Sequence, residues 1–278
     1  MNPLRWLLAL VAAALLLAGA RQLPVVAAFE QRAAVALESH RTPQLFTPTG
    51  WPAPRYDFEH NPVTRAGFTL GRQLFYDPLL SRDGTLSCGS CHQQFAGFAH
   101  FDHAVSHGIG GVNGTRNAPA LANLAWQPDF MWDGAVHHLE VQPIAPLSNV
   151  VEMGETLANV IAKLQASADY PVRFAAAFGT PGIDSQRLLR ALAQFTGTLI
   201  SARSRYDLGT LSNDETRGLA VFRQRCASCH AEPLFTDFQY RNNGLDAVPK
   251  EPGRAAISGK PEDAGRFRVP SLRNVAVS

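Results

Sequence analysis

The chain has 278 residues, 46% of them hydrophobic, which is enough to bury a substantial core, and its length favours two domains. Its formal net charge is +2 and no basic cluster occurs, so the composition argues against a nucleic-acid partner.

The N-terminus has the pattern of an export signal. Arg5 precedes an apolar run from Trp6 to Ala18, and small residues follow at Ala18-Gly19-Ala20. The run is shorter than the ~20 residues that a membrane-spanning helix needs. We therefore predict a signal peptide over residues 1–20, followed by an N-terminal extension over 21–60; cleavage after Ala28 and an uncleaved anchor are the alternatives.

Helical periodicity recurs along the rest of the chain, whereas strand signals are poor, so we predict an all-α fold. Pro171 is expected to end one helical pattern, and Gly179 is expected to stop a short helix. Ser212 and Glu215 have the spacing of a capping box. The predicted helices cover residues 61–76, 155–168, 173–178, 184–203 and 213–226.

Periodicity fails between residues 97 and 146, where glycine, proline, asparagine and tryptophan are frequent. A loop of this length inside a domain is usually functional or disordered, and its aromatic content favours an ordered loop. Residues 205–211 lie between two predicted helices and mark a natural boundary. We expect domains over 61–207 and 208–278.

All four cysteines lie in two Cys-x-x-Cys-His runs, Cys88–His92 and Cys226–His230. This spacing is the attachment pattern of c-type haem, in which two thiols form thioethers to the porphyrin and the histidine binds the iron. A thioredoxin-like motif needs no following histidine, a zinc site needs two ligand pairs close in sequence, and disulfides between residues i and i+3 are strained. We therefore predict two covalently bound c-type haems.

Several further motifs resemble, in order, those of the bacterial di-haem cytochrome c peroxidases and their relative MauG. The resemblance covers roughly residues 62–278 and implies a mostly helical, two-domain periplasmic enzyme with one cytochrome c-like haem domain on each side of the boundary. It implies that His92 is the proximal ligand of the haem that meets hydrogen peroxide, and that His230 is the proximal ligand of the electron-transfer haem. The motifs are 70–78 (LGRQLFYDP), 81–88 (SRDGTLSC), 114–119 (GTRNAP), 132–134 (WDG), 152–154 (EMG) and 267–275 (FRVPSLRNV).

The resemblance also implies roles for residues near the first haem. Glu152 matches the glutamate that moves protons during peroxide cleavage, although an acid here could simply favour the N-terminus of the next helix. Gln142 and Pro146 match the distal pocket, where a glutamine could orient peroxide or be an ordinary loop amide. Trp132 matches an electron conduit between the haems, or is a large buried aromatic residue.

Two further ligands follow from the resemblance. Asn117 matches a residue that binds calcium at the domain interface. The position of a distal haem histidine falls on Ile109, so His107, two residues away, would need a shifted loop to serve. Without such a histidine the haem would stay open to peroxide, as in MauG-like members.

The C-terminus departs from the family pattern. No histidine or methionine follows His230, whereas family members carry a sixth ligand for the second haem beyond the match at 267–275. We therefore expect the C-terminal domain to be incomplete. Tyr240 is the one downstream tyrosine, and nothing in the sequence favours it as a ligand.

The leading functional prediction is a periplasmic peroxidase that reduces hydrogen peroxide to water with electrons from a small soluble redox protein, a cytochrome c or a cupredoxin. A MauG-like oxidase that modifies a protein substrate and a di-haem electron carrier without substrate chemistry are the alternatives. Glu152 and Gln142 count against the carrier. A homodimer is compatible with the resemblance.

Overall fold

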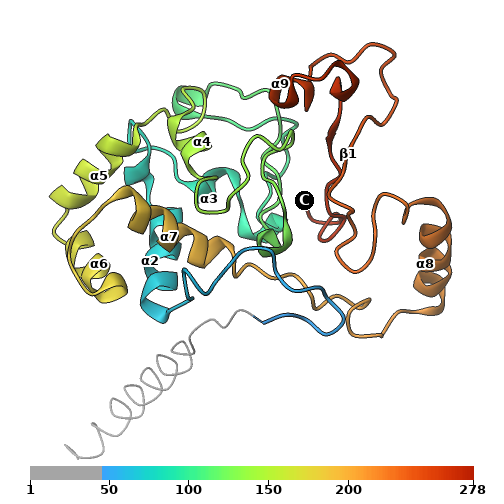
Figure 1. The fold of residues 1–278 in the computed structure, drawn as a ribbon, viewed down its shortest axis with the longest axis horizontal. Helices are drawn as coiled ribbons and strands as arrows, with labels where there is room; N and C mark the ends of the chain where they lie inside the picture. The colour runs from blue at the N-terminus through green and yellow to red at the C-terminus, as the bar shows by residue number, and fades with distance from the viewer. Residues whose placement is uncertain (1–45) are drawn as a thin grey trace, which may run out of the picture. The chain divides into compact units, whose positions relative to one another are not determined.

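Helices dominate the part of the chain that the computed structural model describes, residues 46–278 (Figure 1). The predicted signal peptide, and the extension as far as residue 45, lie outside the described residues. The α-helices are α2 (Arg65–Tyr76), α3 (Cys88–Cys91), α4 (Ile144–Ser148), α5 (Leu157–Ala166), α6 (Tyr170–Phe178), α7 (Ser185–Thr196), α8 (Asn213–Arg225) and α9 (Ala255–Ser258). None of the described helices is long and apolar enough to cross a membrane.

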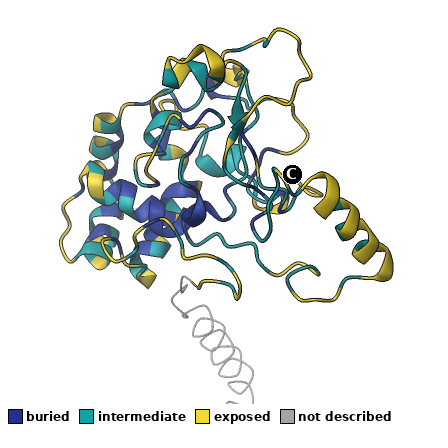
Figure 2. Cartoon of the chain, turned by 45° about the vertical axis from the view of Figure 1, so that its right-hand side comes forward, coloured by how far each residue is buried: buried dark blue, intermediate teal, exposed yellow. Residues whose placement is uncertain are grey.

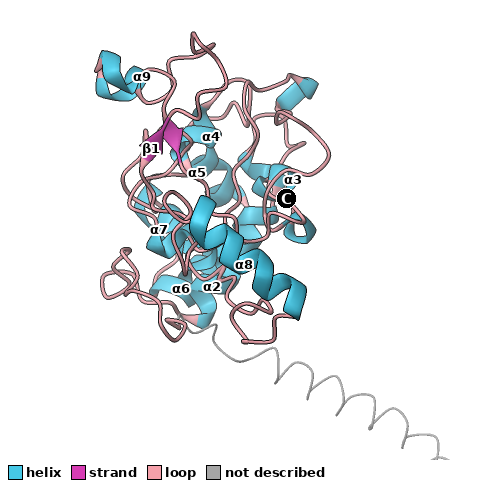
Figure 3. Ribbon diagram, turned by 90° about the vertical axis from the view of Figure 1, so that its right-hand side faces the viewer, coloured by secondary structure: helices cyan, strands magenta, loops and turns pink. Residues whose placement is uncertain are grey.

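Two short strands depart from the all-α expectation. Strands β1 (Tyr240–Arg241) and β2 (Phe267–Arg268) pair antiparallel, with Tyr240 opposite Arg268. The described part is therefore mostly helical with one small sheet. Single 3-10 turns lie at Pro78–Leu80, Gln94–Ala96, Ile109–Gly111, Leu124–Trp126 and Pro261–Asp263, and much of the remaining chain is loop (Figure 3).

Capping residues set the helix starts. Thr64 accepts a hydrogen bond from the Gly67 amide at 3.0 Å, so the first predicted helix begins at Arg65 and not near residue 61. The predicted capping box before α8 is confirmed, since the Ser212 amide donates to Glu215 at 2.8 Å and the Glu215 amide donates to Ser212 at 3.2 Å.

Two further helix boundaries were predicted wrongly. Pro171 lies in the first turn of α6, where a proline needs no amide hydrogen, so this helix begins at Tyr170 and not at residue 173. Helix α7 ends at Thr196 and not near residue 203. Beyond it the backbone bonds to the long loop instead, because the Asn123 amide donates to the Leu199 carbonyl at 2.8 Å.

The hydrophobic core centres on the packing of α2 against α7, and burial is concentrated there (Figure 2). The two backbones come so close that a Cβ atom on Gly71 would lie 1.9 Å from the Ala191 carbonyl oxygen. Fully buried side chains on the two helices include Leu74, Leu188 and Leu192.

Helix α8, by contrast, has no buried residue in the structure. Its Phe222 reaches back to Phe235, with the ring centroids 5.4 Å apart. All described residues belong to one compact unit, and the predicted boundary near residue 207 falls in the connection between α7 and α8. The division into two haem domains stays a prediction.

The close approach of α2 and α7 generates a stability prediction. The substitution Gly71→Ala should lower the free energy of unfolding by about 2 kcal/mol, because the added methyl group forces a packed backbone apart. Gly218→Ala in α8 is the matched control, since a Cβ atom there meets nothing within 4 Å and should stabilise the helix by up to about 1 kcal/mol. Urea unfolding of both variants measures the difference, and equal effects would contradict the packing.

Candidate active site

Helix α3 presents the two sulfur atoms of the first Cys-x-x-Cys-His run to one cavity. The Ser87 amide donates to the Ser90 hydroxyl at 3.1 Å and starts the single turn, in which Cys88 and Cys91 are three residues apart. Residues at this spacing lie on the same face of a helix. Burial raises the pKa of Cys88 to about 12, so its thiol is neutral.

His92 is oriented as a metal ligand would be. Its Nδ1 lies 3.0 Å from the Phe98 carbonyl oxygen, which can only accept, so Nδ1 carries the proton and Nε2 is left with its lone pair. Burial lowers the pKa of His92 to about 4, although the bond to Phe98 opposes that shift. The imidazole is therefore neutral near pH 7, which is the form that binds a metal.

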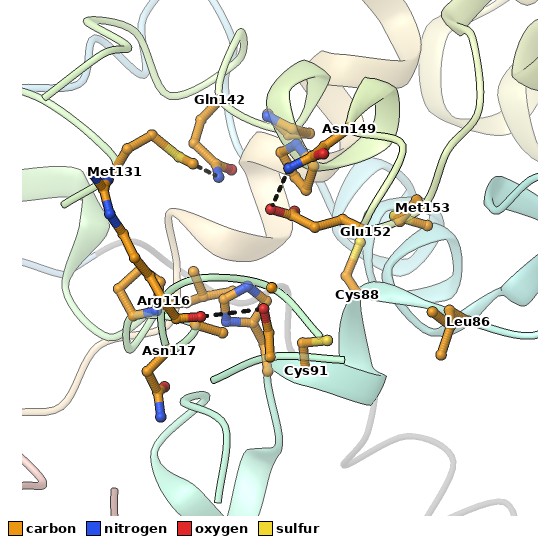
Figure 4. A pocket seen from close by; sticks show the side chains of 18 of the residues that line it. Leu86, Cys88, Cys91, Arg116, Asn117, Met131, Gln142, Asn149, Glu152 and Met153 are labelled. Carbon is orange, nitrogen blue, oxygen red and sulfur yellow. Dashed lines mark hydrogen bonds between the residues drawn. The ribbon is translucent and has the colours of Figure 1, made fainter. Parts of the chain in front are cut away.

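The first cavity has a volume of about 280 Å³ and gathers residues that lie far apart in the sequence (Figure 4). Its lining includes Cys88, Cys91, His92, Trp132, Gln142, Pro146 and Glu152. The structure thus brings the first motif together with the residues predicted for the distal pocket.

Glu152 lies in the loop that precedes α5, five residues before the helix begins, and not in its first turn. The Asn149 side-chain amide donates to Glu152 Oε1 at 3.0 Å. Burial raises the pKa of Glu152 and the bond from Asn149 opposes that rise. The Ile109 amide donates to the Glu152 carbonyl at 2.8 Å, so the residue at the expected distal-histidine position instead supports the backbone of the glutamate.

Glu155, unlike Glu152, does serve the start of α5. Its carboxylate accepts from the Thr156 amide at 2.9 Å and lies 2.5 Å from Lys163 Nζ. Lys163 also donates to the Ser81 carbonyl at 2.7 Å. Although burial alone would raise the pKa of Glu155, Lys163 holds it below its ordinary value. The pair fastens the end of the Glu152 loop to the segment that follows α2.

Gln142 precedes α4 and lines the same cavity. Its Nε2 donates to the Met131 sulfur at 3.7 Å (Figure 4). Met131 adopts a left-handed backbone conformation with φ of 68°. The Met131 thioether thus holds the amide nitrogen of Gln142, and the amide oxygen takes no part in this hydrogen bond.

A second cavity, of about 670 Å³, contains Cys229 and His230 of the second motif. Nδ1 of His230 lies 3.1 Å from the Pro270 carbonyl and 3.2 Å from the Phe235 carbonyl, so this ring is also oriented with Nε2 free. Cys226 is exposed and does not line the cavity. Trp132 lines both cavities, and its indole Nε1 donates to the Asn117 carbonyl at 2.8 Å.

The assignments of His107 as a distal haem ligand and of Asn117 as a calcium ligand stay predictions. The His107 ring packs edge-on against His103 at 4.7 Å and against His100 at 5.7 Å, while its carbonyl oxygen lies 3.6 Å from the Cys91 sulfur. The Asn117 side-chain amide donates to the His103 carbonyl at 2.8 Å. Within the described residues, no group of three or more histidine, cysteine, aspartate or glutamate side chains is arranged to hold a metal ion.

Residues 65–216 match the family model described as di-haem cytochrome c peroxidase. The methylamine utilization protein MauG of Methylophilus methylotrophus is 32% identical over 78% of this chain and 68% of its own length. The cytochrome c551 peroxidase of Nitrosomonas europaea is 32% identical over 75% of this chain and 66% of its own length. The chain thus spans about two thirds of the length of these relatives.

Solved structures that resemble this chain belong to the same kinds of protein as its sequence relatives. A MauG-like protein associated with microbial copper homeostasis superimposes with a TM-score of 0.73 at 34% identity, over 84% of this chain and 76% of that one. The diheme peroxidase BthA from Burkholderia thailandensis gives 0.67 at 27% identity, over 84% and 69%. The chain belongs to the di-haem cytochrome c peroxidase family, a family of oxidoreductases that includes proteins named as peroxidases and proteins named MauG.

Membership implies two haems, and the residues present fit them. Each cavity contains a histidine with a carbonyl-bound Nδ1 and a free Nε2, next to at least one cysteine sulfur of its motif. The first cavity is lined largely by apolar groups, which suits a porphyrin face.

Sequence reasoning missed three residues that the structure adds. Asn149 bonds to Glu152, Met131 bonds to Gln142, and Arg268 lines the second cavity. The first two are short-range loop contacts with no sequence pattern of their own. Arg268 stands inside the motif at 267–275, but the motif does not say whether its charge is paired.

The ion pair between the buried Glu155 and the partly exposed Lys163 can be tested by measuring stability. Lys163→Met should lower the free energy of unfolding by roughly 2 to 3 kcal/mol, because it leaves the Glu155 carboxylate buried without its partner. Arg217→Met is the control, since its pair with Asp214 in α8 is exposed and should contribute less than about 1 kcal/mol. Chemical denaturation compares the two, and a Lys163 effect as small as the control's would contradict a structural role for the pair.

Proposed function

We propose that this protein reduces hydrogen peroxide to water in the first cavity. The observation that carries the proposal is the position of Glu152, a partly buried carboxylate in the cavity that also contains Cys88, Cys91 and His92. The bound haem would supply the iron that receives peroxide and the change in oxidation state. The overall reaction consumes two electrons and two protons for each peroxide and yields two water molecules.

The role of Glu152 follows from its surroundings. An ionised carboxylate can accept the proton from one peroxide oxygen and return it to the oxygen that leaves as water. Burial brings the pKa of Glu152 up toward the working range, while Asn149 keeps the ionised form accessible. Gln142 lines the same cavity and can orient peroxide or the carboxylate through its amide.

Electrons would enter at the second cavity and pass by Trp132, which lines both cavities. The proposed cofactors are two c-type haems, bound by thioethers to Cys88 and Cys91 and to Cys226 and Cys229. Covalent haem and the N-terminal signal together support a periplasmic location, with a small soluble cytochrome c or cupredoxin as donor. Asn117 remains the proposed calcium ligand.

A MauG-like oxidation of a protein substrate is the second candidate. It is favoured by the relatives named MauG, at 32% and 36% identity, and by the MauG-like structure at 34% identity. Both candidates use the same first cavity. They differ in whether the electrons come from a small redox protein or from side chains of a protein substrate.

The substitution Glu152→Gln tests the proposal. Steady-state peroxide turnover with reduced cytochrome c should fall by about 10²- to 10⁴-fold, because the amide can neither accept nor return the proton. The holoprotein must first be shown to carry two covalent haems per chain in both the parent and the variant. Glu262→Gln, at an exposed position, is the control.

Two outcomes would count against the peroxidase. Unchanged turnover in Glu152→Gln would remove the carboxylate from the reaction. If the parent protein consumes peroxide without oxidising any small donor, the MauG-like candidate gains.

Asn149→Ala should change the pH dependence of peroxide turnover. The ionised form of Glu152 loses the hydrogen bond that favours it, so the pKa of Glu152 rises and the acidic limb of the rate profile moves to higher pH. Asn159→Ala is a matched control, because Asn159 donates to Glu155 at 3.0 Å in the same way but outside the cavity. A pH–rate profile that moves equally in both variants, or in neither, would contradict the assignment of Glu152 as the base.

A further inference from the structure

Arg268 is a buried cation in the wall of the second cavity. It lies on strand β2 and is 5% exposed, and it lines the cavity together with Cys229 and His230. Its backbone amide donates to the Trp132 carbonyl at 2.8 Å, and its Nε donates to the Met131 carbonyl at 3.4 Å. The side chain is therefore fixed between Trp132 and the second cavity.

The charge of Arg268 has no carboxylate partner within the described part of the chain. The other two cations of this cavity are paired, Arg241 with Asp237 at 2.5 Å and Lys250 with Asp246 at 3.6 Å. Arg268 forms no such ion pair among the described residues, and burial lowers its pKa. A buried charge without a counter-ion is costly, so the site requires an anion.

The carboxylate whose charge acts on Arg268 is already engaged elsewhere. Asp129 acts on Arg268 only at a distance, because it accepts from the Tyr240 hydroxyl at 3.0 Å and lies 2.6 Å from His137 Nδ1. The two terminal nitrogens of Arg268 have no acceptor among residues 46–278. Their planar, parallel N–H groups match a carboxylate.

We propose that Arg268 binds a propionate carboxylate of the haem held by the second Cys-x-x-Cys-His motif, and so positions the acidic edge of that haem next to the backbone of Trp132. The inference depends on the presence of the second haem and not on the reaction with peroxide. It makes Arg268 a cofactor-binding residue that also fixes the spacing between the second haem and Trp132.

The arginine that lines the first cavity, by contrast, already has carboxylate partners. Arg116 lines it, but its guanidinium is already paired with Asp133 at 2.7 Å and with Glu251 at 2.9 Å, and it stacks on Phe267 at 5.2 Å. The two arginines therefore differ in charge compensation although both are bonded to the segment 131–133, Arg268 through the Met131 and Trp132 carbonyls and Arg116 through Asp133. This difference places the unmatched positive charge on the side of the second haem.

The test measures the reduction potentials of the two haems in the holoprotein by spectroelectrochemical titration. Arg268→Gln should lower the midpoint potential of one haem and leave the other unchanged, because a positive charge beside a haem favours the reduced form. Arg268→Lys should give a smaller shift. Arg241→Gln removes a paired, more exposed cation from the same cavity and should shift the potential least.

Wild-type potentials for both haems in Arg268→Gln would overturn the proposal. If that variant does not accumulate with two haems, the propionate-bending band in the resonance Raman spectrum of Arg268→Lys decides. A shifted band for one haem supports the contact, and an unchanged band overturns it. Because neither measurement uses peroxide, failure of the proposed peroxidase reaction would leave this result intact.

Discussion

The structure around both cavities depends on the hydrogen bonds that hold residues 131–133. The Trp132 indole donates to the Asn117 carbonyl, and the Trp132 carbonyl accepts from the Arg268 amide. The first bond ties the segment to an earlier part of the same long loop and the second ties it to β2. Asp133 adds a charged link through Arg116 to Glu251. Trp132 lines both cavities, so any shift in this short segment would change both at once.

The loops around the sites are fixed to the helical core at a few points, since they lack regular hydrogen bonding of their own. Lys163 joins the Glu152 loop to the segment after α2, and Asn123 joins the long loop to the chain beyond α7. Gly108 allows another close approach, because a Cβ atom there would lie 1.8 Å from the Val151 carbonyl. Helices α2 and α7 form the packed core, and these contacts hold the loops that carry Glu152 and Gln142 in fixed positions relative to it.

Prediction from sequence succeeded where local chemistry decides the structure. The capping box at Ser212 and the helical periodicities both act within a few residues. It failed at Thr196, because the backbone beyond that residue pairs with a loop more than seventy residues away. The ion-pair partners of the arginines could not be predicted from the sequence either. Whether Arg116 or Arg268 has a carboxylate partner depends on which acidic residues the fold brings near, and no spacing rule encodes that.

The electrostatics of the two cavities differ in a way that suits different work. In the first, the unpaired ionisable group is a carboxylate, Glu152, held only by a neutral amide, so it can exchange a proton. In the second, the unpaired group is a cation, Arg268, which cannot readily give up its proton and can only attract negative charge. A site that consumes protons needs the former, and a site that stores or passes electrons is favoured by the latter. The demand on the first cavity is the same whether the electrons come from a small redox protein or from a protein substrate, because cleaving peroxide to water requires proton transfer on either route.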